Sequence, residues 1–216
     1  MHRFALPLLF SIACVSQVAV AQQPRAFVGG GMIVSSQSTD PICQQGSGCA
    51  RPALGGTTWG FAADLGWFVG PTLSVGAELS VPQRLETVQQ TAIPNERIER
   101  RHRDAVVSGV VKVHTPTFGA MRFAVVGGGG LVQESTSSRS TSAPFGSTIF
   151  PPFGPETTES SWRFGVVAGA DLDVIAGPHF SIAPQLRVHV IDRATNNSLG
   201  LASLVWRPAV VARVRF

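Results

Sequence analysis

After its first 21 residues, the sequence lacks any apolar run long enough to form a transmembrane helix. Such a helix needs about 20 consecutive apolar residues. The later apolar stretches are shorter, and polar residues, glycine or proline interrupt them. This absence excludes a membrane protein built from helices.

Charged residues are also scarce, and lysine is almost absent. Asp, Glu, Lys and Arg make up 14% of the chain, and the formal net charge is only +4. Lys112 is the only lysine, and the arginines are dispersed along the chain. A nucleic-acid partner is therefore not expected.

The chain has only three cysteines, and Cys14 lies in the apolar run near the amino terminus. Cys43 and Cys49 lie close together in the segment CQQGSGC, which has no histidine. In an exported protein, such a pair predicts a disulfide that closes a small ring. A metal site would need more ligands nearby, so neither a metal nor a cofactor is expected.

The first 21 residues have the pattern of a secretory signal peptide. Arg3 precedes the run FALPLLFSIACVSQVAV, and Ala19, Val20 and Ala21 supply small residues before a cleavage site. We predict cleavage after Ala21, which leaves residues 22–216 as one domain. A lipoprotein signal ending at Cys14 is the alternative, but Ser11 stands where such signals prefer Leu.

Hydrophobic residues in the rest of the chain alternate with polar or small ones, which is the period of a β-strand. Eight segments show this alternation over a length sufficient for a tilted strand to cross a bilayer. They cover residues 25–35, 58–69, 72–88, 97–114, 119–135, 157–176, 179–193 and 201–216. An antiparallel sheet of eight strands is therefore expected.

The connections between these segments alternate in length. Short Gly/Pro-containing turns follow residues 69, 114 and 176, whereas residues 36–57, 89–96, 136–156 and 194–200 form longer polar connections. Short turns at one end and long loops at the other are typical of outer-membrane barrels. Trp59, Trp67, Trp162 and Trp206 suit the aromatic girdles of such barrels, although the chain has no tyrosine.

The last segment, LASLVWRPAVVARVRF, carries the clearest version of the pattern. One face is apolar from Ala202 to Phe216, and the other face carries Arg207, Arg213 and Arg215. An aromatic carboxyl-terminal residue on such a strand resembles the closing strand of the small bacterial outer-membrane β-barrel superfamily, of the OmpA transmembrane-domain, OmpX and OmpW type. The resemblance covers residues 22–216.

This resemblance implies an all-β protein that forms an eight-stranded antiparallel up-and-down transmembrane β-barrel in the bacterial outer membrane. It implies contact with outer-membrane lipids and with the barrel-assembly machinery, for which Phe216 is part of the assembly signal. A monomer is expected. The rival architecture is a soluble, periplasmic, lipocalin-like barrel, in which the apolar face points inward.

In the transmembrane register, the inner face receives both acidic and basic side chains, which must pair because an isolated buried charge is costly. The expected network comprises Asp64, Glu78, Arg122, Arg163, Asp171, Asp173, Arg187, His189, Arg207 and Arg213, with Asp104 and Lys112 also facing inward. We expect a local cluster in which Asp171 and Asp173 meet Arg187 and His189. This network either fills the barrel or forms a gate.

The sequence favours a structural or surface-interaction role through the extracellular loops. A narrow channel for small solutes or ions is the alternative, and a lipid A-modifying enzyme that uses His102 and Asp104 with Ser135 or Ser161 is a weaker one. We expect no catalysis, because no nucleophile motif is present. The basic run of Arg97, Arg100, Arg101 and Arg103 either binds lipopolysaccharide phosphates or forms a solvated strand end.

Overall fold

The structure is a computed structural model that describes residues 25–39, 42–44, 48–50, 55–90, 96–144, 149–192 and 201–216. These residues form strands and no helix. The strands are β1 (Ala26–Thr39), β2 (Ile42–Gln44), β3 (Gly48–Ala50), β4 (Gly56–Phe68), β5 (Leu73–Pro82), β6 (Leu85–Gln90), β7 (Glu96–His114), β8 (Met121–Ser142), β9 (Thr157–Ile175), β10 (Phe180–Ile191) and β11 (Leu201–Arg215). The predicted signal peptide lies outside the described residues.

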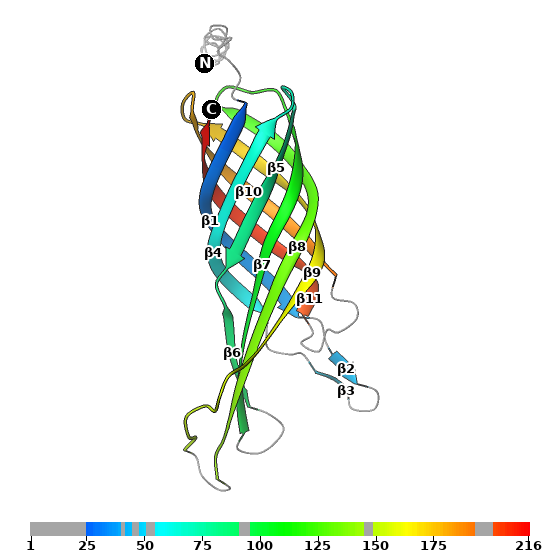
Figure 1. Cartoon of the computed structure of the whole chain (residues 1–216), viewed down its shortest axis with the longest axis vertical. Coiled ribbons are helices and arrows are strands. Elements are labelled where there is room, and N and C mark those ends of the chain that lie inside the picture. Colours follow the sequence, from blue (N-terminus) through cyan, green and yellow to red (C-terminus); the bar gives the residue numbers. More distant parts are fainter. Residues whose placement is uncertain are drawn as a thin grey trace, which may run out of the picture.

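The main sheet closes on itself to form an eight-stranded antiparallel barrel (Figure 1). The strands follow the order β5–β4–β1–β11–β10–β9–β8–β7, and β5 also pairs with β7. The first and last barrel strands meet along a ladder that runs from Phe27 opposite Arg215 to Thr39 opposite Leu201. The expected fold class is therefore confirmed.

Several strand boundaries differ from the sequence prediction, and β1 ends at Thr39 instead of residue 35. The predicted segment 72–88 is divided into β5 and β6 at Gln83 and Arg84, next to Pro82, which has no N–H to donate to a ladder. β8 continues to Ser142 instead of ending at residue 135, so the predicted loop 136–156 is partly strand. Alternation could not reveal this extension, because its Ser/Thr-rich sequence is polar on both faces.

The apolar faces of the strands point away from the barrel axis, and the charged faces point into it. Along β11, Trp206, Val210 and Val214 are exposed, whereas Arg207 and Arg213 are buried. Trp59, Trp67 and Trp162 are also exposed, as are Phe61 and Phe164. An inward apolar face, the lipocalin-like alternative, is therefore wrong. No helix among the described residues is long and apolar enough to span a membrane.

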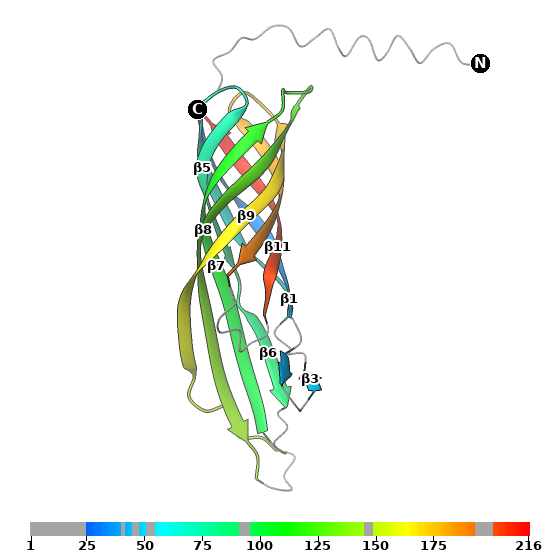
Figure 2. The same ribbon diagram turned by 90° about the vertical axis from the view of Figure 1, so that its right-hand side faces the viewer.

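The two ends of the barrel differ. The described chain starts and ends at the same end, which also carries the connections 69–72, 115–120 and 176–179; we call it the short-turn end (Figures 1 and 2). There the backbone N–H of Arg25 donates to the carbonyl of Phe216 at 2.8 Å. The opposite end, the long-loop end, carries the outer parts of β6, β7, β8 and β9 (Figure 2).

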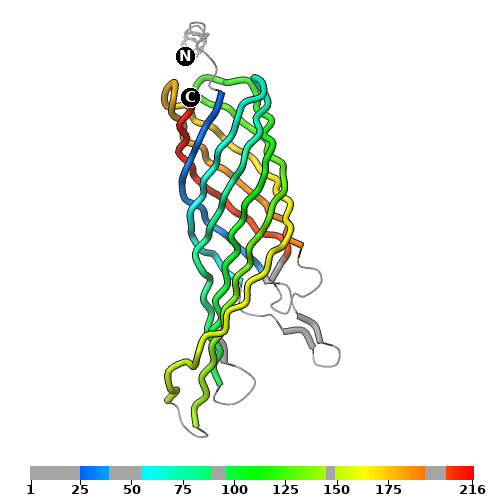
Figure 3. The backbone as a smooth tube through the Cα atoms, in the orientation of Figure 1, coloured from blue at the N-terminus to red at the C-terminus, as the bar shows by residue number. Residues whose placement is uncertain are grey.

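These outer parts extend past the apolar belt. On β8 the outward apolar side chains end with Leu131, and the following residues up to Ser142 are mostly polar. About ten further residues of strand correspond to about 30 Å of length. Figure 3 shows the backbones of β7 and β8 continuing together beyond the closed barrel. A polar sheet therefore projects from the long-loop end.

The first long connection contains a short hairpin made of β2 and β3. Its backbone register places Cys43 directly opposite Cys49. Directly opposed residues of an antiparallel pair have Cα atoms about 4.5–5.5 Å apart, which falls within the range that a disulfide spans. The predicted disulfide between these two residues stays a prediction, and the register is compatible with it.

We expect protein isolated from membranes under non-reducing conditions to contain this disulfide. Intact-mass analysis after alkylation should show no free thiol in the processed chain, and reduction before alkylation should reveal two. Because the barrel closes without this hairpin, Cys43→Ser should change the free energy of unfolding little. Alkylation of both cysteines without prior reduction would contradict the prediction.

Candidate functional site

The barrel interior contains a dense group of ion pairs near its short-turn half. We call this group the inner ion network; its members are Asp64, Glu78, Lys112, Asp171, Asp173, Arg187, Arg213 and Arg215. They come from β4, β5, β7, β9, β10 and β11, and strand alternation turns all of them inward. Four carboxylates thus face four cations.

Lys112 connects three of the carboxylates. Its Nζ lies 3.2 Å from Asp64 Oδ2, 2.7 Å from Glu78 Oε1 and 3.2 Å from Asp171 Oδ2. Oxygen atoms of these three acids lie within 4.8 Å of one another, a spacing at which they could hold a metal ion. The lysine ammonium already contacts all three, so it supplies the positive charge that a metal ion would bring.

Two arginines complete the pairing from the adjacent strands β10 and β11. Arg187 donates two hydrogen bonds to Glu78, from Nε at 2.8 Å and from Nη2 at 2.6 Å. Its Nη1 lies 2.6 Å from Asp171 Oδ1. Arg213 donates to Asp64, to Asp171 at 2.7 Å and to Asp173 at 2.6 Å. Each arginine therefore joins carboxylates from different strands.

Strand β1 supplies space for this network and contributes no charge to it. Gly29 lies directly between Asp64 on β4 and Arg213 on β11 in the strand register. Because Gly29 has no side chain, Arg213 reaches across β1 to Asp64 and donates from Nε at 2.8 Å. The Phe27 ring also lies 5.3 Å from Lys112 Nζ and 5.1 Å from the Arg213 guanidinium carbon, within cation–π range.

The network is closed to solvent. Seven of its members are at most 5% exposed, and the Glu78 side chain is 12% exposed. Burial makes each ion depend on its partners, and loss of one partner from a buried pair costs about 3–5 kcal/mol. The network is thus buried, and its four carboxylates balance its four cations.

A second polar cluster lies closer to the long-loop end. His102 Nε2 is 2.6 Å from Asp104 Oδ1, and His102 Nδ1 is 3.0 Å from the hydroxyl of Thr136. Arg207 donates from Nη2 to the backbone carbonyl of Asp104 at 3.0 Å and from Nη1 to the hydroxyl of Ser80. His102 is 1% exposed, and both of its ring nitrogens have partners.

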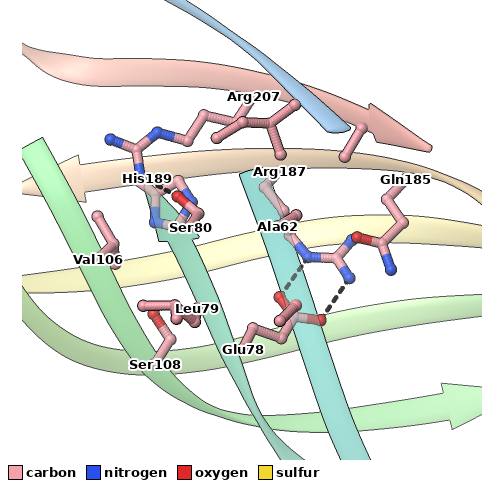
Figure 4. Close-up of a pocket in the computed structure, with 13 residues that line it drawn as sticks. Ala62, Glu78, Leu79, Ser80, Val106, Ser108, Gln185, Arg187, His189 and Arg207 are labelled. Atoms are coloured by element: carbon pink, nitrogen blue, oxygen red, sulfur yellow. Dashed lines mark hydrogen bonds and ion pairs between the residues drawn. The ribbon is translucent and has the colours of Figure 1, made fainter. Parts of the chain in front are cut away.

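A small cavity separates the two groups (Figure 4). Figure 4 shows Arg187 bonded to Glu78 on one side, and His189 and Ser80 beside Arg207 on the other. The cavity volume is about 20 Å³, which is room for about one water molecule. The described side chains therefore leave no wide aqueous passage between the two groups.

The predicted inward-facing residues divide among four places. Asp64, Glu78, Asp171, Asp173, Arg187 and Arg213 lie in the inner ion network, and His189 and Arg207 line the small cavity. Arg163 lies 3.5 Å from Glu134 toward the long-loop end, and Arg122 lies at the short-turn end. The sequence prediction grouped Asp171 and Asp173 with Arg187 and His189. In the structure Arg187 contacts Asp171 and, across the barrel on β5, Glu78. Asp173 pairs instead with Arg213 and Arg215, and His189 lines the cavity outside this cluster.

The structure does not assemble the residues of the enzyme alternative. His102 bonds with Asp104 and Thr136, whereas Ser135 pairs across the sheet with Arg103 and Ser160. Adjacent residues of a strand point to opposite faces, so Ser135 points away from the face that carries His102. Among the described residues, no hydrogen bond joins His102 to Ser135 or to Ser161.

The projecting sheet carries a separate charged cluster. Arg101 Nε lies 2.8 Å from Glu99 and 3.1 Å from Glu86. Arg139 donates three hydrogen bonds to Glu99, from Nε at 3.0 Å and from Nη2 at 2.8 and 3.0 Å. The hydrogen bonds with Glu99 raise the pKa of Arg139. A hydrogen bond from Ser137, together with the nearby arginines, lowers the pKa of Glu156.

Residues 149–156 fold back over this sheet. Thr141 donates to the carbonyl of Pro151 at 2.8 Å, and the Phe150 ring lies 3.8 Å from the guanidinium carbon of Arg97. Phe153 stacks with Arg139 at 5.1 Å. Of the predicted lipopolysaccharide contacts, Arg97 and Arg101 are therefore engaged with protein groups, whereas Arg100 and Arg103 are partly exposed.

An open groove lies at the long-loop rim, where strands β4 and β6 separate from each other. Its lining residues are Thr57, Thr58, Gln83, Arg84, Leu85, Glu86 and Arg103, and its volume is about 700 Å³. Trp59, at the edge of the apolar belt, accepts a hydrogen bond from the Gln83 N–H at 2.7 Å. Arg84 was not among the predicted contacts, because it stands alone in the sequence, apart from the basic run.

Searches against known proteins give structural matches only. No protein-family model matches the chain, and no curated protein matches it. Among solved structures, the attachment invasion locus protein Ail of Yersinia pestis matches with a TM-score of 0.50 and 13% identity, covering 90% of this chain and 99% of Ail. A structure of Ail in complex with the heparin analogue sucrose octasulfate matches with a TM-score of 0.51 and 12% identity, covering 90% of this chain and 99% of Ail.

The outer membrane protein OprG of Pseudomonas aeruginosa gives a TM-score of 0.49 and 12% identity, covering 90% of this chain and 97% of OprG. At such low identity the two matches to Ail show the fold alone. The expected resemblance to the small outer-membrane β-barrels is thus confirmed at the level of the fold.

Gly29 and Gly30 provide a test of the inner ion network within two adjacent residues. A Cβ at Gly29 would lie 2.4 Å from Asp64 Oδ1 and 2.8 Å from Arg213 Cγ, whereas a Cβ at Gly30 would have no atom within 4 Å. We expect Gly29→Ala to lower the free energy of unfolding by about 1–3 kcal/mol through overpacking. The measurement is urea unfolding of the refolded barrel, followed by tryptophan fluorescence.

Gly30→Ala is the matched control, and its effect should stay within about 0.5 kcal/mol. Both variants add the same methyl group to the same strand, so strand propensity cancels in the comparison. Equal unfolding free energies for the two variants would contradict the proposed packing of Asp64 and Arg213 across β1.

Proposed function

We propose that the chain is an integral outer-membrane barrel that acts at the cell surface through the sheet projecting from its long-loop end. The single observation that carries this proposal is the contrast between the filled interior and the polar sheet formed by the outer parts of β6, β7, β8 and β9. The apolar exterior of the barrel supports a place in lipid, because apolar side chains face outward around the closed sheet.

In this orientation the short-turn end faces the periplasm and the long-loop end faces the exterior, as in barrels with short periplasmic turns. Phe216 would then act as part of the assembly signal at the periplasmic end. One structural neighbour is an attachment invasion locus protein, which supports a surface role for this fold. The plugged interior favours the surface role.

We expect the refolded protein to be non-conducting in a planar bilayer. The inner ion network joins β4, β5, β7, β9, β10 and β11 across the interior, and only a cavity of about 20 Å³ separates it from the next polar cluster. A known porin in the same bilayer serves as the positive control. Regular unitary conductance steps from heat-modifiable, folded protein would instead support the channel alternative.

We further propose that lipopolysaccharide phosphates bind in the groove at the long-loop rim. Arg84 and Arg103 both line this groove beside Thr57 and Thr58, and Trp59 marks the nearby edge of the apolar belt. Arginine forms charge-assisted, bidentate bonds with phosphate, and a lipid phosphate lies at the same level as the interfacial aromatic residues.

The test is the stabilisation of the barrel by added lipid A in maltoside micelles. Replacing Arg84 and Arg103 by Gln together should weaken binding of lipid A by about tenfold or more, as expected for lost charged hydrogen bonds. The midpoint of thermal unfolding, measured against lipid A concentration, reports this change. Arg97→Gln is the control, since Arg97 packs against Phe150 away from the groove. Equal stabilisation of all three proteins would contradict the assignment.

A further inference from the structure

The mouth of the barrel at the short-turn end contains a cavity that the surface role does not use. Its volume is about 410 Å³, and it is lined by Phe68, Pro71, Thr72, Thr115, Pro116, Thr117, Arg122, Ile175 and Arg215. Residues 71–72 and 115–117 belong to two of the connections between strands. Arg122 and Arg215 enter the cavity from β8 and β11, so two guanidinium groups share it.

Arg215 is a buried cation that is only weakly paired. It is 5% exposed, and its nearest carboxylate contact is 3.4 Å, from Nη2 to Asp173 Oδ2. The other oxygen of Asp173 is bonded to Arg213 Nη1 at 2.6 Å. Nη2 of Arg215 is buried and has no hydrogen-bond acceptor in the described part of the chain. This group retains an unused donor beside the cavity.

Arg122 also has a buried donor without a hydrogen-bond acceptor. Its Nη2 donates to the carbonyl of Pro71, and its guanidinium carbon lies 5.1 Å from the Phe68 ring. Its Nε is buried and has no acceptor among the described residues. An unsatisfied buried donor costs free energy, and more so when it carries a charge. A ligand that accepts from both arginines would remove this cost.

The charge balance at the mouth points to an anion. The inner ion network is neutral when Arg215 is counted within it, with four carboxylates and four cations. Arg122 therefore adds a positive charge with no carboxylate of its own in that network. Asp173, opposite Arg122 in the strand register, already faces both Arg213 and Arg215.

We propose that the mouth cavity binds an oxyanion of the phosphate class. The two guanidinium groups supply donors from β8 and β11, and Thr72 and Thr117 line the cavity from two connections. A phosphate group accepts hydrogen bonds in several directions and prefers arginine partners. The phosphate comes from a free phosphate ion in the aqueous phase or from the phosphodiester headgroup of a membrane lipid.

Titration of the refolded, isotope-labelled full barrel in dodecyl maltoside micelles tests the proposal, because this detergent contains no phosphate. The probe is inorganic phosphate, and the observables are the NMR resonances of the Thr72 and Thr117 backbone amides and of the arginine Nε–H groups. We expect saturable shifts of these resonances, and Arg122→Gln should weaken phosphate binding by about tenfold.

Arg163→Gln is the matched control, because it removes the same charge toward the opposite end of the barrel, from a residue that lines neither the mouth cavity nor the rim groove. If Arg122→Gln does not fold, Arg122→Lys replaces it; that variant keeps the charge, loses the guanidinium donors and should also bind more weakly. Absence of saturable shifts with both phosphate and the lipid probe below would overturn the proposal. So would equal affinity in the Arg122 variant and the Arg163 control.

A parallel titration distinguishes the two sources of phosphate. Dihexanoyl-phosphatidylglycerol, a short-chain phosphodiester lipid, is the second probe. If this lipid binds more tightly than inorganic phosphate, and if the Arg122 variant loses that binding, the lipid headgroup is the ligand. The reverse order identifies a free phosphate ion. Either order supports the phosphate-class site, whatever the result at the long-loop end.

Discussion

Closure of the sheet is the constraint on which the rest of the structure depends. The pairing of β1 with β11 joins the first and last barrel strands, so that every barrel strand has a neighbour on both sides. Closure also separates an outer from an inner face, and strand alternation assigns each side chain to one of them. The apolar side chains then lie outside, and the ionisable ones are enclosed.

Enclosure explains why the interior is a network of many ion pairs. A buried charge needs partners from the strands around it, and in a narrow barrel those partners come from across the lumen as well as from adjacent strands. Lys112 contacts acids on β4, β5 and β9, and Arg187 on β10 bonds to Glu78 on β5. Ion pairs of the network therefore connect opposite walls of the barrel. Their side chains occupy the part of the lumen through which a channel would have to pass.

The two ends of the barrel offer different chemistry. At the long-loop end, a polar sheet with internally paired charges extends past the apolar belt, and a rim groove carries Arg84 and Arg103. At the short-turn end, Arg122 and Arg215 face a cavity with incompletely satisfied donors. The inner ion network lies in the lumen between these two ends.

The sequence by itself determined the strand alternation, the short and long connections and the number of barrel strands, because each depends on local periodicity. It turned most of the buried charges inward but left Arg215 out of the expected network. It did not determine the division at Pro82 or the extension of β8 to Ser142, because sequences polar on both faces carry no alternation signal. Only the tertiary structure decided that Arg187 meets Glu78, that Lys112 joins three acids and that Gly29 leaves room for Arg213. Those contacts depend on how closure aligns distant strands around the lumen, and side-chain period alone does not encode that alignment.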